Sequence, residues 1–286
     1  MVIATKGRPA DLARTLARLA ACEPGPAETI VVDGDPGRSA EPVVAETRPG
    51  LAVRYVESEP GLTRQRNLGV REAGGDVVVF LDDDVDVDRG LFAALERGYR
   101  DPHVVGATGH VIEAAERRFG NKRSVVRSLV LGGGREGTMT SFGYPRRPQR
   151  HDRELDVEFM QGCFMSGRRD EVARVGFDEQ LDGYALAEDE DFSYRLSRVG
   201  RVRYLPEAVV HHRNTGFRSA AARELGRAVV VNRAYLFRKN FRRTLRARLG
   251  FAALVLVLVA HRAVNREWQG VRGLFEGSLE AWRART

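Results

Sequence analysis

The sequence predicts an α/β fold with a central, mostly parallel sheet flanked by helices. Over the first hundred residues, short β-branched runs alternate with helical patterns, and Gly and Pro residues separate the segments. Residues 77–81 form a continuous apolar run, which is typical of a strand covered on both faces. With 286 residues, 43% of them hydrophobic, the chain is long enough for a sizeable core, and this composition excludes an intrinsically disordered protein.

Each predicted element rests on a local pattern. Pro9 suits the first turn of a helix, and Leu12, Leu16 and Leu19 recur on one face of that helix. A second helix is predicted over residues 62–73, because two glycines follow it directly. The β-branched runs predict strands over residues 2–5, 29–32, 53–56 and 77–81.

The second half of the chain has weaker patterns. Residues 111–157 contain three consecutive glycines, Pro145, Pro148 and scattered arginines, which indicate long loops over the sheet. Regular structure is predicted again from residue 159. The patterns then favour helices over residues 169–175 and 189–199, and a strand over residues 202–205.

The charge of the chain is divided unevenly. Residues 216–286 hold 15 Lys or Arg and 4 Glu, a net charge of +11, whereas the remaining 215 residues hold 31 basic and 35 acidic side chains, a net charge of −4. A nucleic-acid-binding protein would carry its basic residues on the folded domain, so nucleic acid is not an expected partner. An acidic body with a basic tail is typical of an enzyme held near an anionic membrane surface.

The basic tail also contains an apolar segment. Residues 251–260 are all apolar, and as a helix they would be only about 15 Å long at ~1.5 Å per residue. The hydrocarbon core of a bilayer is about 30 Å thick, so we do not expect this segment to span a membrane. We expect a helical tail that lies in the membrane interface. The alternative is a pair of amphipathic helices packed on the body, with their arginines in solvent.

Cysteine usage indicates a reducing compartment. Cys22 and Cys163 are the only cysteines, so the chain has neither a disulfide framework nor a Cys-rich zinc site. The chain begins with a strand-like segment, where a secretory signal would need a basic stretch and a longer apolar one. We therefore expect a cytoplasmic protein at the inner face of the cell membrane.

The strongest chemical signal is an acidic run, residues 82–88, directly after the predicted strand at 77–81. Ligands of open α/β sheets bind beyond the carboxyl ends of the strands, so these carboxylates are placed where a substrate would bind. Alternation along an extended segment puts Asp82 and Asp84 on one side and Asp83 on the other. Two carboxylates in this arrangement can hold Mg²⁺ or Mn²⁺ and leave positions open for phosphate oxygens.

Three other interpretations of the acidic run have less support. A calcium loop that starts at Asp84 would need Gly in place of Arg89 and Glu in place of Leu95. The D-D-x-x-D motif of prenyl-diphosphate synthases requires a helix, whereas the preceding apolar run favours a strand. The third interpretation is a solvated acidic turn, but like charges at this density repel one another unless a cation joins them.

Several short motifs occur in a fixed order over residues 1–215. They are residues 3–9, a strand that ends in Asp33, Arg66-Asn67-Leu68-Gly69, Phe80-Leu81 with the three aspartates, residues 175–179, Glu188-Asp189-Glu190-Asp191, and Pro206 six residues before His212. With this order and spacing the chain resembles the family 2 glycosyltransferases. The resemblance implies the GT-A fold, a Rossmann-like α/β sheet, to which the C-terminal helical extension would be added.

The resemblance implies an inverting glycosyltransferase, which moves a sugar from a UDP-, GDP- or dTDP-sugar to a hydroxyl of a glycan, lipid-linked or small-molecule acceptor. The catalytic domain would cover residues 1–215, with a nucleotide-binding half over 1–110, an acceptor half over 111–215, and a basic helical tail over 216–286. Mn²⁺ or Mg²⁺ would bridge the diphosphate, held by Asp84 and by His212 or its neighbour His211. The implied nucleotide-binding residues are Thr5, Arg8, Asp33, Arg66, Asp82 and Asp83.

The second acidic cluster would supply the catalytic base. The resemblance assigns this role to Asp189, which would deprotonate the acceptor hydroxyl as it attacks the anomeric carbon, and it assigns acceptor contacts to Glu188, Gly162 and Cys163. A carboxylate accepts a proton better when acidic neighbours raise its pKa. For residues 190 and 191 the alternative is structural, because acids at a helix N-terminus interact favourably with the macrodipole.

The sequence departs from the family's common pattern at two places. Lys6-Gly7 replaces an aromatic residue and Asn, and Asp35-Pro36 stands where Gly-Ser is frequent, so the identity of the nucleotide stays open. Two other functions also stay open. A sugar-phosphate nucleotidyltransferase would use residues 6–9 as a short triphosphate loop, and a non-catalytic nucleotide-sugar-binding protein would need neither Asp84 nor Asp189.

Overall fold

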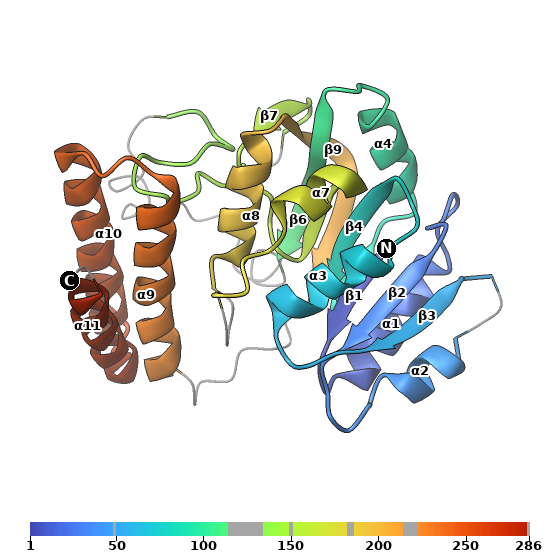
Figure 1. Cartoon of the computed structure of the whole chain (residues 1–286), viewed down its shortest axis with the longest axis horizontal. Helices are drawn as coiled ribbons and strands as arrows, with labels where there is room; N and C mark the ends of the chain where they lie inside the picture. Colours follow the sequence, from blue (N-terminus) through green and yellow to red (C-terminus); the bar gives the residue numbers. More distant parts are fainter. Residues whose placement is uncertain (48–49, 114–133, 149–150, 182–185, 214–221, 285–286) are drawn as a thin grey trace.

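A nine-stranded sheet forms the centre of the molecule in this computed structural model, which describes residues 1–47, 50–113, 134–148, 151–181, 186–213 and 222–284 (Figure 1). The strand order is β3-β2-β1-β4-β8-β6-β9-β5, and β7 pairs with β9. The strands are β1 (Val2–Thr5), β2 (Thr29–Asp33), β3 (Val53–Glu57), β4 (Val77–Asp82), β5 (Val85–Val87), β6 (Val104–Glu113), β7 (Leu155–Val157), β8 (Phe164–Arg168) and β9 (Arg201–His212).

The four strands predicted in the first half are confirmed, and they pair in parallel in the order β3-β2-β1-β4. The second half is mixed, because β8 runs antiparallel to both β4 and β6, whereas β9 runs parallel to β6. Register pairs Thr5 with Asp33, and Ala4 with Asp82. The carboxyl ends of β1, β2 and β4 therefore meet at one edge of the sheet.

Helices cover both faces of the sheet, which confirms the predicted α/β class. Leu12, Leu16 and Leu19 of α1 are buried on one face together with α4, and α3, α7 and α8 cover the other face. The helices of this part are α1 (Pro9–Leu19), α2 (Glu41–Ala45), α3 (Leu62–Glu72), α4 (Leu91–Gly98), α7 (Arg169–Val175) and α8 (Glu188–Ser197).

The glycine of the Arg66-Asn67-Leu68-Gly69 motif allows α3 to lie directly against β1. A Cβ atom at Gly69 would lie 2.3 Å from Val2 Cγ1, so a larger residue would push the helix away from the sheet. The amide of Asn67 exchanges two hydrogen bonds with the backbone of Phe177. The Arg66-Asn67-Leu68-Gly69 motif and the motif at residues 175–179 therefore together fix the position of α3 between the sheet and residues 176–178.

Several elements after β4 were not predicted. Strands β5, β6 and β7 were missed, and β9 extends seven residues beyond the predicted strand at 202–205. The extension contains Pro206, Glu207 and two histidines, which have little β pattern, and it is ordered by pairing with β6 and β5. The expected loops at 111–157 include residues 114–133 and 149–150, which lie outside the described residues.

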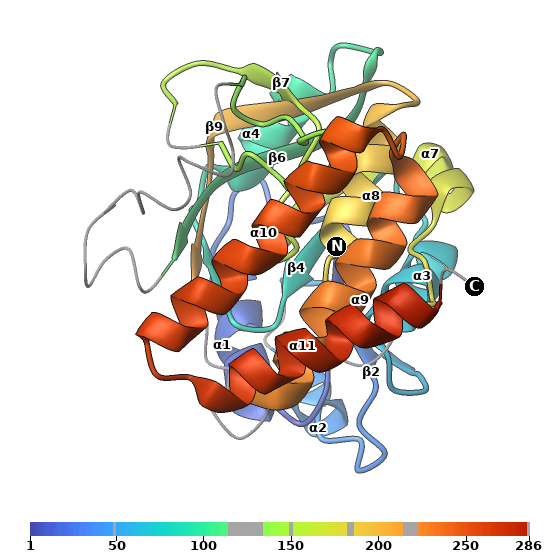
Figure 2. The same cartoon turned by 90° about the vertical axis from the view of Figure 1, so that its left-hand side faces the viewer.

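Three helices follow the sheet, α9 (Ala222–Asn240), α10 (Leu245–Val264) and α11 (Trp268–Arg283), and Figure 2 shows α10 and α11 on the outside of the molecule. Glycines bring α11 close to α9. A Cβ atom at Gly273 would lie 2.0 Å from the Arg223 carbonyl oxygen, and one at Gly277 would lie 2.5 Å from that of Arg227. The predicted helical extension is therefore present.

Helix α9 is attached to α8 by buried polar contacts. The guanidinium of Arg233 donates two hydrogen bonds of 2.6 Å to the Glu190 carboxylate, whose side chain is only 3% exposed. Lys239 and Asn240 both donate to Asp191. Part of the basic tail thus packs on the body with its cations directed inward.

Helix α10 corrects the length expected for the apolar segment. The helix has 20 residues rather than ten, because it continues at both ends past residues 251–260. Its most apolar 18-residue stretch has a mean hydropathy of 1.7, and the helix is about 30 Å long at ~1.5 Å per residue. By length and composition alone, α10 is the one helix among the described residues that could cross a membrane, so it is not too short to span a bilayer.

The Arg233 contact predicts a large stability effect. Arg233→Ala would leave the buried Glu190 carboxylate without its counter-ion, and we expect the free energy of unfolding to fall by about 3–5 kcal/mol. Arg227→Ala removes an exposed pair with Glu280 on the other side of α9 and should cost less than about 1 kcal/mol. Chemical denaturation of both variants checks this, and equal losses would contradict the inward packing of α9.

Candidate active site

The acidic run lies at the carboxyl edge of the sheet, as the sequence predicts. Strand β4 ends at Asp82, and the chain turns through Asp83 and Asp84 into β5. Thr15 of α1 fixes this turn by donating to the carbonyl oxygens of residues 83 and 85. Asp83 and Asp84 are only 1% and 2% exposed, so the solvated acidic turn is excluded.

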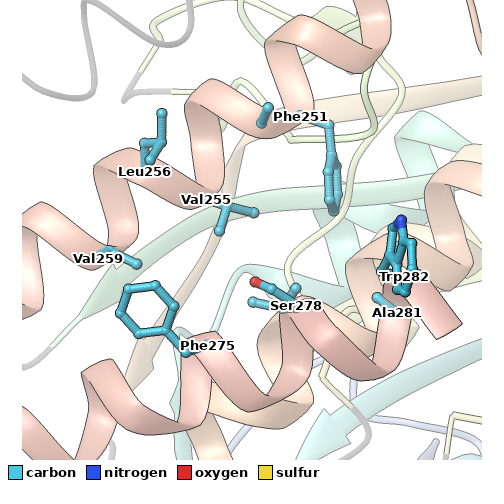
Figure 3. Close-up of a pocket in the computed structure, with 11 residues that line it drawn as sticks. Phe251, Val255, Leu256, Val259, Phe275, Ser278, Ala281 and Trp282 are labelled. Atoms are coloured by element: carbon cyan, nitrogen blue, oxygen red, sulfur yellow. The ribbon is translucent and has the colours of Figure 1, made fainter.

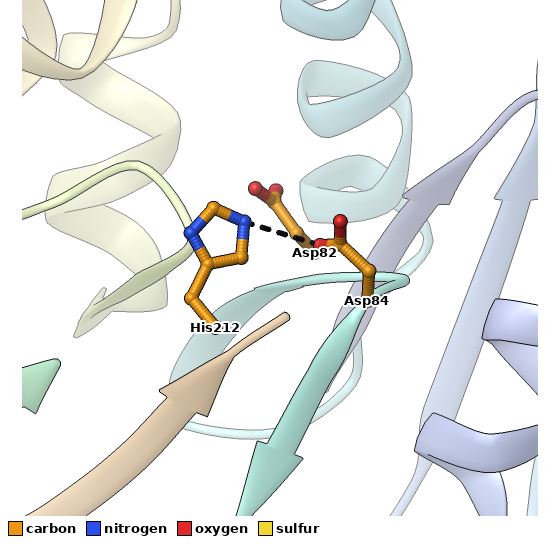
Figure 4. Close-up of side chains that lie close together, drawn as sticks. All are labelled: Asp82, Asp84 and His212. Carbon is orange, nitrogen blue, oxygen red and sulfur yellow. Dashed lines mark ion pairs between the residues drawn. The ribbon is translucent and has the colours of Figure 1, made fainter. Parts of the chain in front are cut away.

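Asp82, Asp84 and His212 lie together, and each directs one potential ligand atom to a common point (Figure 4). These atoms all lie within 4.8 Å of one another. His212 reaches the point because β9 pairs with β5, and its Nε2 lies 3.2 Å from Asp84 Oδ1. The adjacent His211 has Nε2 3.1 Å from Asp88 instead, so geometry favours His212 over His211.

The three side chains fit a divalent cation. Two carboxylates and one imidazole form a donor set that Mn²⁺ accepts, and a site with three protein ligands keeps positions for water or phosphate oxygens. Burial opposes a charged imidazole, but interactions with Asp84, Cys163 and Glu113 outweigh it and raise the pKa of His212 to about 12. Only the neutral imidazole can be a ligand, so a cation bound here would displace this proton and replace its positive charge.

Asp83 points to Thr5 and Arg8. Its carboxylate accepts a 2.6 Å hydrogen bond from Thr5 Oγ1 and a charged one from Arg8 Nε at 3.2 Å. Burial raises the pKa of Asp83 to about 6, although the Thr5 hydrogen bond and the Arg8 charge act in the opposite direction. Arg8 also contacts Asp84 Oδ2 at 3.2 Å, so this guanidinium lies beside the cation site.

Asp33 is fully buried at the end of β2. Its carboxylate accepts hydrogen bonds from the backbone N–H groups of Asp35 and Ala40 at 2.9 and 3.1 Å. The Tyr55 hydroxyl lies 3.4 Å from the same carboxylate. Asp33 therefore organises the loop after β2, and its contact with a nucleotide base stays a prediction.

Arg66 connects the cation site to the second acidic cluster. This arginine of α3 is only 2% exposed, and its guanidinium donates to Asp82 at 3.1 Å and to Glu188 at 2.9 Å. It also donates to the Gly162 carbonyl oxygen at 2.8 Å and lies 5.3 Å from the ring centroid of Phe177. One buried cation thus holds carboxylates from β4 and α8 in the same place.

The four acids of the second cluster occupy the first turn of α8 and have different partners. Glu188 pairs with Arg66, whereas Glu190 and Asp191 pair with α9. Asp189 is partly exposed and accepts a 3.0 Å hydrogen bond from the Gly162 N–H group. A Cβ atom at Gly162 would lie 3.3 Å from the Asp189 carboxylate, so a side chain there would crowd this carboxylate. Among the described residues, no cation forms an ion pair with Asp189, in contrast to the other three acids.

The backbone is strained at the start of α8, and burial raises the pKa of Glu188 in the same turn. Ala187 adopts a left-handed conformation with φ 72°, which is uncommon for a residue with a Cβ atom and costs about 1–3 kcal/mol. Burial and the charge of Asp189 raise the pKa of Glu188 to about 8, against the opposing charge of Arg66. Strain and a shifted pKa at the same turn are typical of a functional site.

Cys163 and Glu113 surround His212. Burial raises the pKa of the Cys163 thiol to about 11, although the neighbouring His212 acts in the opposite direction. Glu113 Oε2 lies 3.1 Å from His212 Nδ1, so Glu113 orients the imidazole. Glu113 was missed by sequence reasoning, because only the pairing of β6 with β9 brings it opposite His212. Acceptor contacts of Cys163 stay a prediction.

Comparisons with known proteins agree with this geometry. A family model described as glycosyl transferase family 2 matches residues 1–176, and a comparison with curated proteins gives no match. The mannosyltransferase PcManGT from Pyrobaculum calidifontis, solved with GDP-Man and Mn²⁺, is similar over all of this chain and 87% of its own, with 16% identity and a TM-score of 0.62.

Two further solved structures are similar at low identity. TarS 1-349 from S. aureus is 16% identical over all of this chain and 91% of its own, with a TM-score of 0.55, and another structure of it contains UDP-GlcNAc. GalNAc-T7 with UDP, GalNAc and Mn²⁺ is 21% identical over 80% of this chain and 47% of its own, with a TM-score of 0.56.

At these identities the structural likeness shows a shared GT-A fold, and the family match covers more than half of the chain. The chain therefore belongs to glycosyltransferase family 2 and is a glycosyltransferase.

Proposed function

We propose that this enzyme transfers a sugar from a nucleoside-diphosphate sugar to an acceptor hydroxyl with inversion at the anomeric carbon. The observation that carries the proposal is the Arg66 contact, which joins Asp82 at the cation site to the acidic cluster of α8. Support for the donor class comes from PcManGT and TarS, whose structures contain GDP-Man and UDP-GlcNAc.

The donor half of the proposed reaction uses the edge of the sheet. Asp82, Asp84 and His212 would hold Mn²⁺ or Mg²⁺, which would stabilise the negative charge that develops on the departing nucleoside diphosphate. The other proposed nucleotide-binding residues lie around the same edge of the sheet or hold side chains that lie there. They are Thr5, Arg8, Asp33, Arg66 and Asp83. Arg8 is one-third exposed beside Asp84, so its guanidinium can bind a phosphate oxygen directly.

The acceptor half of the proposed reaction uses Asp189. This carboxylate would accept the proton of the attacking hydroxyl, which contributes a rate factor of roughly 10²–10⁴ in enzymes. Gly162 positions Asp189 through its N–H group, and Glu188 is tied to Arg66 and is not available as a nucleophile. A single displacement with one base fits these contacts, and it inverts the configuration.

We also propose the division of the chain and its location. Residues 1–110 carry most of the donor contacts, residues 111–215 supply the acceptor side with Gly162, Cys163 and Glu188, and residues 216–286 form the basic tail. A tail charge of +11 supports a place at the inner, anionic face of the cell membrane. The acceptor would be a hydroxyl of a glycan, a lipid-linked molecule or a small molecule.

Asp189→Asn should slow transfer strongly and leave donor binding largely intact. The amide cannot take the proton of the acceptor, so we expect kcat to fall by roughly 10²–10⁴-fold while the donor Kd changes little. Turnover and calorimetry with a donor found by thermal-shift screening measure the two quantities. Asp170→Asn on α7, at a side chain 92% exposed, is the matched control. Near-normal turnover of Asp189→Asn would refute the assignment of the base.

Asp84→Ala should remove cation-dependent nucleotide binding. With Mn²⁺, a bound nucleoside diphosphate raises the Tm of the native protein, and this rise should vanish in the variant or on addition of EDTA. Asp88 lies in the same acidic run, and its side chain is 50% exposed. The control variant Asp88→Ala should therefore keep the full rise in Tm. A cation-dependent shift that persists in Asp84→Ala would show that the cation binds elsewhere.

Glu188→Gln should change the pH dependence of stability. In the folded protein the pKa of Glu188 is raised to about 8, so between roughly pH 5 and 8 the folded state keeps a proton that the unfolded chain has released. Because of this extra proton, the free energy of unfolding of the wild type falls as pH rises through that window. Gln does not titrate, so the substitution removes this contribution. Denaturation at several pH values should therefore show a flatter profile for Glu188→Gln, with Glu59→Gln as the exposed control. An unchanged slope would contradict the raised pKa.

A further inference from the structure

Helices α10 and α11 expose an unusual number of large apolar side chains. Among the described residues, nine large hydrophobic side chains are classed as exposed, and eight of them lie on these two helices. The ninth, Val199, is only 38% exposed. The eight are Leu245, Leu249, Leu256, Val264, Trp268, Phe275, Leu279 and Trp282, with exposed fractions between 58% and 82%.

The apolar side chains of α11 share one face of the helix. Trp268, Phe275, Leu279 and Trp282 are separated by seven, four and three residues, which places them within one stripe. The opposite face carries the glycines that pack against α9. One side of α11 is therefore used within the protein, and the other side presents two Trp, a Phe and a Leu to the outside.

A hollow of about 430 Å³ lies between the two helices (Figure 3). Its lining is almost entirely apolar, and Phe251, Val255 and Val259 of α10 face Phe275 and Trp282 of α11 across it. Ser278 is the one residue with a polar side chain among the described residues that line the hollow. The exposed stripe of α11 thus continues into a recess that can take an apolar chain.

Positive charge surrounds this apolar surface. The three acids of residues 241–284 are each ion-paired within the tail, Glu267 with Arg262, Glu276 with Arg223 and Glu280 with Arg227. Seven exposed arginines lie on α10, on α11 and in the segments before each of them. They are Arg242, Arg243, Arg246, Arg248, Arg266, Arg272 and Arg283.

We propose that the outer face of α10 and α11, defined by the eight exposed apolar residues and these arginines, docks on an anionic lipid bilayer with both helices lying in its interface. Apolar side chains with two Trp suit the acyl boundary, and the arginines suit anionic headgroups. The inference rests on the proposed location at a membrane and names the surface that makes the contact.

The contacts of α10 favour an interfacial over a spanning position. Its buried residues Ala247 and Leu254 pack with Phe142 and Phe237, so one side of the helix is attached to the body of the protein. Arg246, Arg248 and Arg262 lie on the same helix, close to its two ends. A helix held along one side by a folded domain can lie on a bilayer without leaving that domain.

The tryptophans of the chain give a direct test. The chain has two, Trp268 and Trp282, and both lie on the proposed surface. The full-length protein is mixed at low salt with vesicles of phosphatidylcholine containing 30% phosphatidylglycerol, with brominated acyl chains as quencher. We expect a blue shift and quenching of the emission, co-flotation with the vesicles, and release at 1 M NaCl. Pure phosphatidylcholine vesicles should bind at least tenfold more weakly.

Two variants locate the contact. Phe275→Glu combined with Leu279→Glu should weaken flotation at least tenfold and remove the quenching, whereas Val199→Glu, an exposed apolar residue outside the tail, should change neither. All variants should keep the Tm rise with Mn²⁺ and nucleotide, because α10 and α11 carry no residue assigned to the active site.

Four results would overturn the inference. Absence of flotation would refute both the docking surface and the proposed location. Flotation that persists in the Phe275 and Leu279 variant would refute the surface and leave the location standing. Flotation that resists both 1 M NaCl and carbonate would indicate a spanning helix. A dimer in sedimentation, with blue-shifted emission before vesicles are added, would show that a second copy covers the face.

Discussion

A single buried arginine links the two halves of the site. Arg66 leaves α3 beneath the carboxyl edge of the sheet and donates hydrogen bonds to both Asp82 of β4 and Glu188 of α8. Without this cation, both carboxyl groups would lose a charge-assisted hydrogen bond. Its position depends in turn on Gly69, which brings α3 against β1, and on Asn67, which fixes residues 176–178. The motif containing these three residues is thus the structural support of the site.

Much of the fold and part of the site could be predicted from the sequence. The first four strands and helices α1, α3, α7 and α8 follow from local periodicity, and alternation placed Asp83 opposite Asp82 and Asp84. Long-range pairing could not be predicted. The orientation of His212 by Glu113 arises from the register of β6 with β9, and the separate partners of Glu188, Glu190 and Asp191 depend on α3 and α9. The length of α10 was also missed, because the helix continues through polar residues on both sides of the apolar run.

The basic residues of the tail have two different roles, which composition alone cannot separate. Arg233 and Lys239 point inward and hold the helix that carries Asp189, whereas the arginines around α10 and α11 are exposed. The same helix α9 therefore contacts the first turn of α8 on one side and α11 on the other.

A crystal structure with Mn²⁺ and a bound nucleoside-diphosphate sugar, with anomalous data at the manganese edge, would test the central claim most directly. The account predicts one manganese peak ligated by Asp82, Asp84 and His212, and an anomeric carbon that lies between this peak and the Asp189 carboxylate, with Arg66 still in contact with Asp82 and Glu188. A peak at another cluster, or a sugar directed away from Asp189, would contradict it.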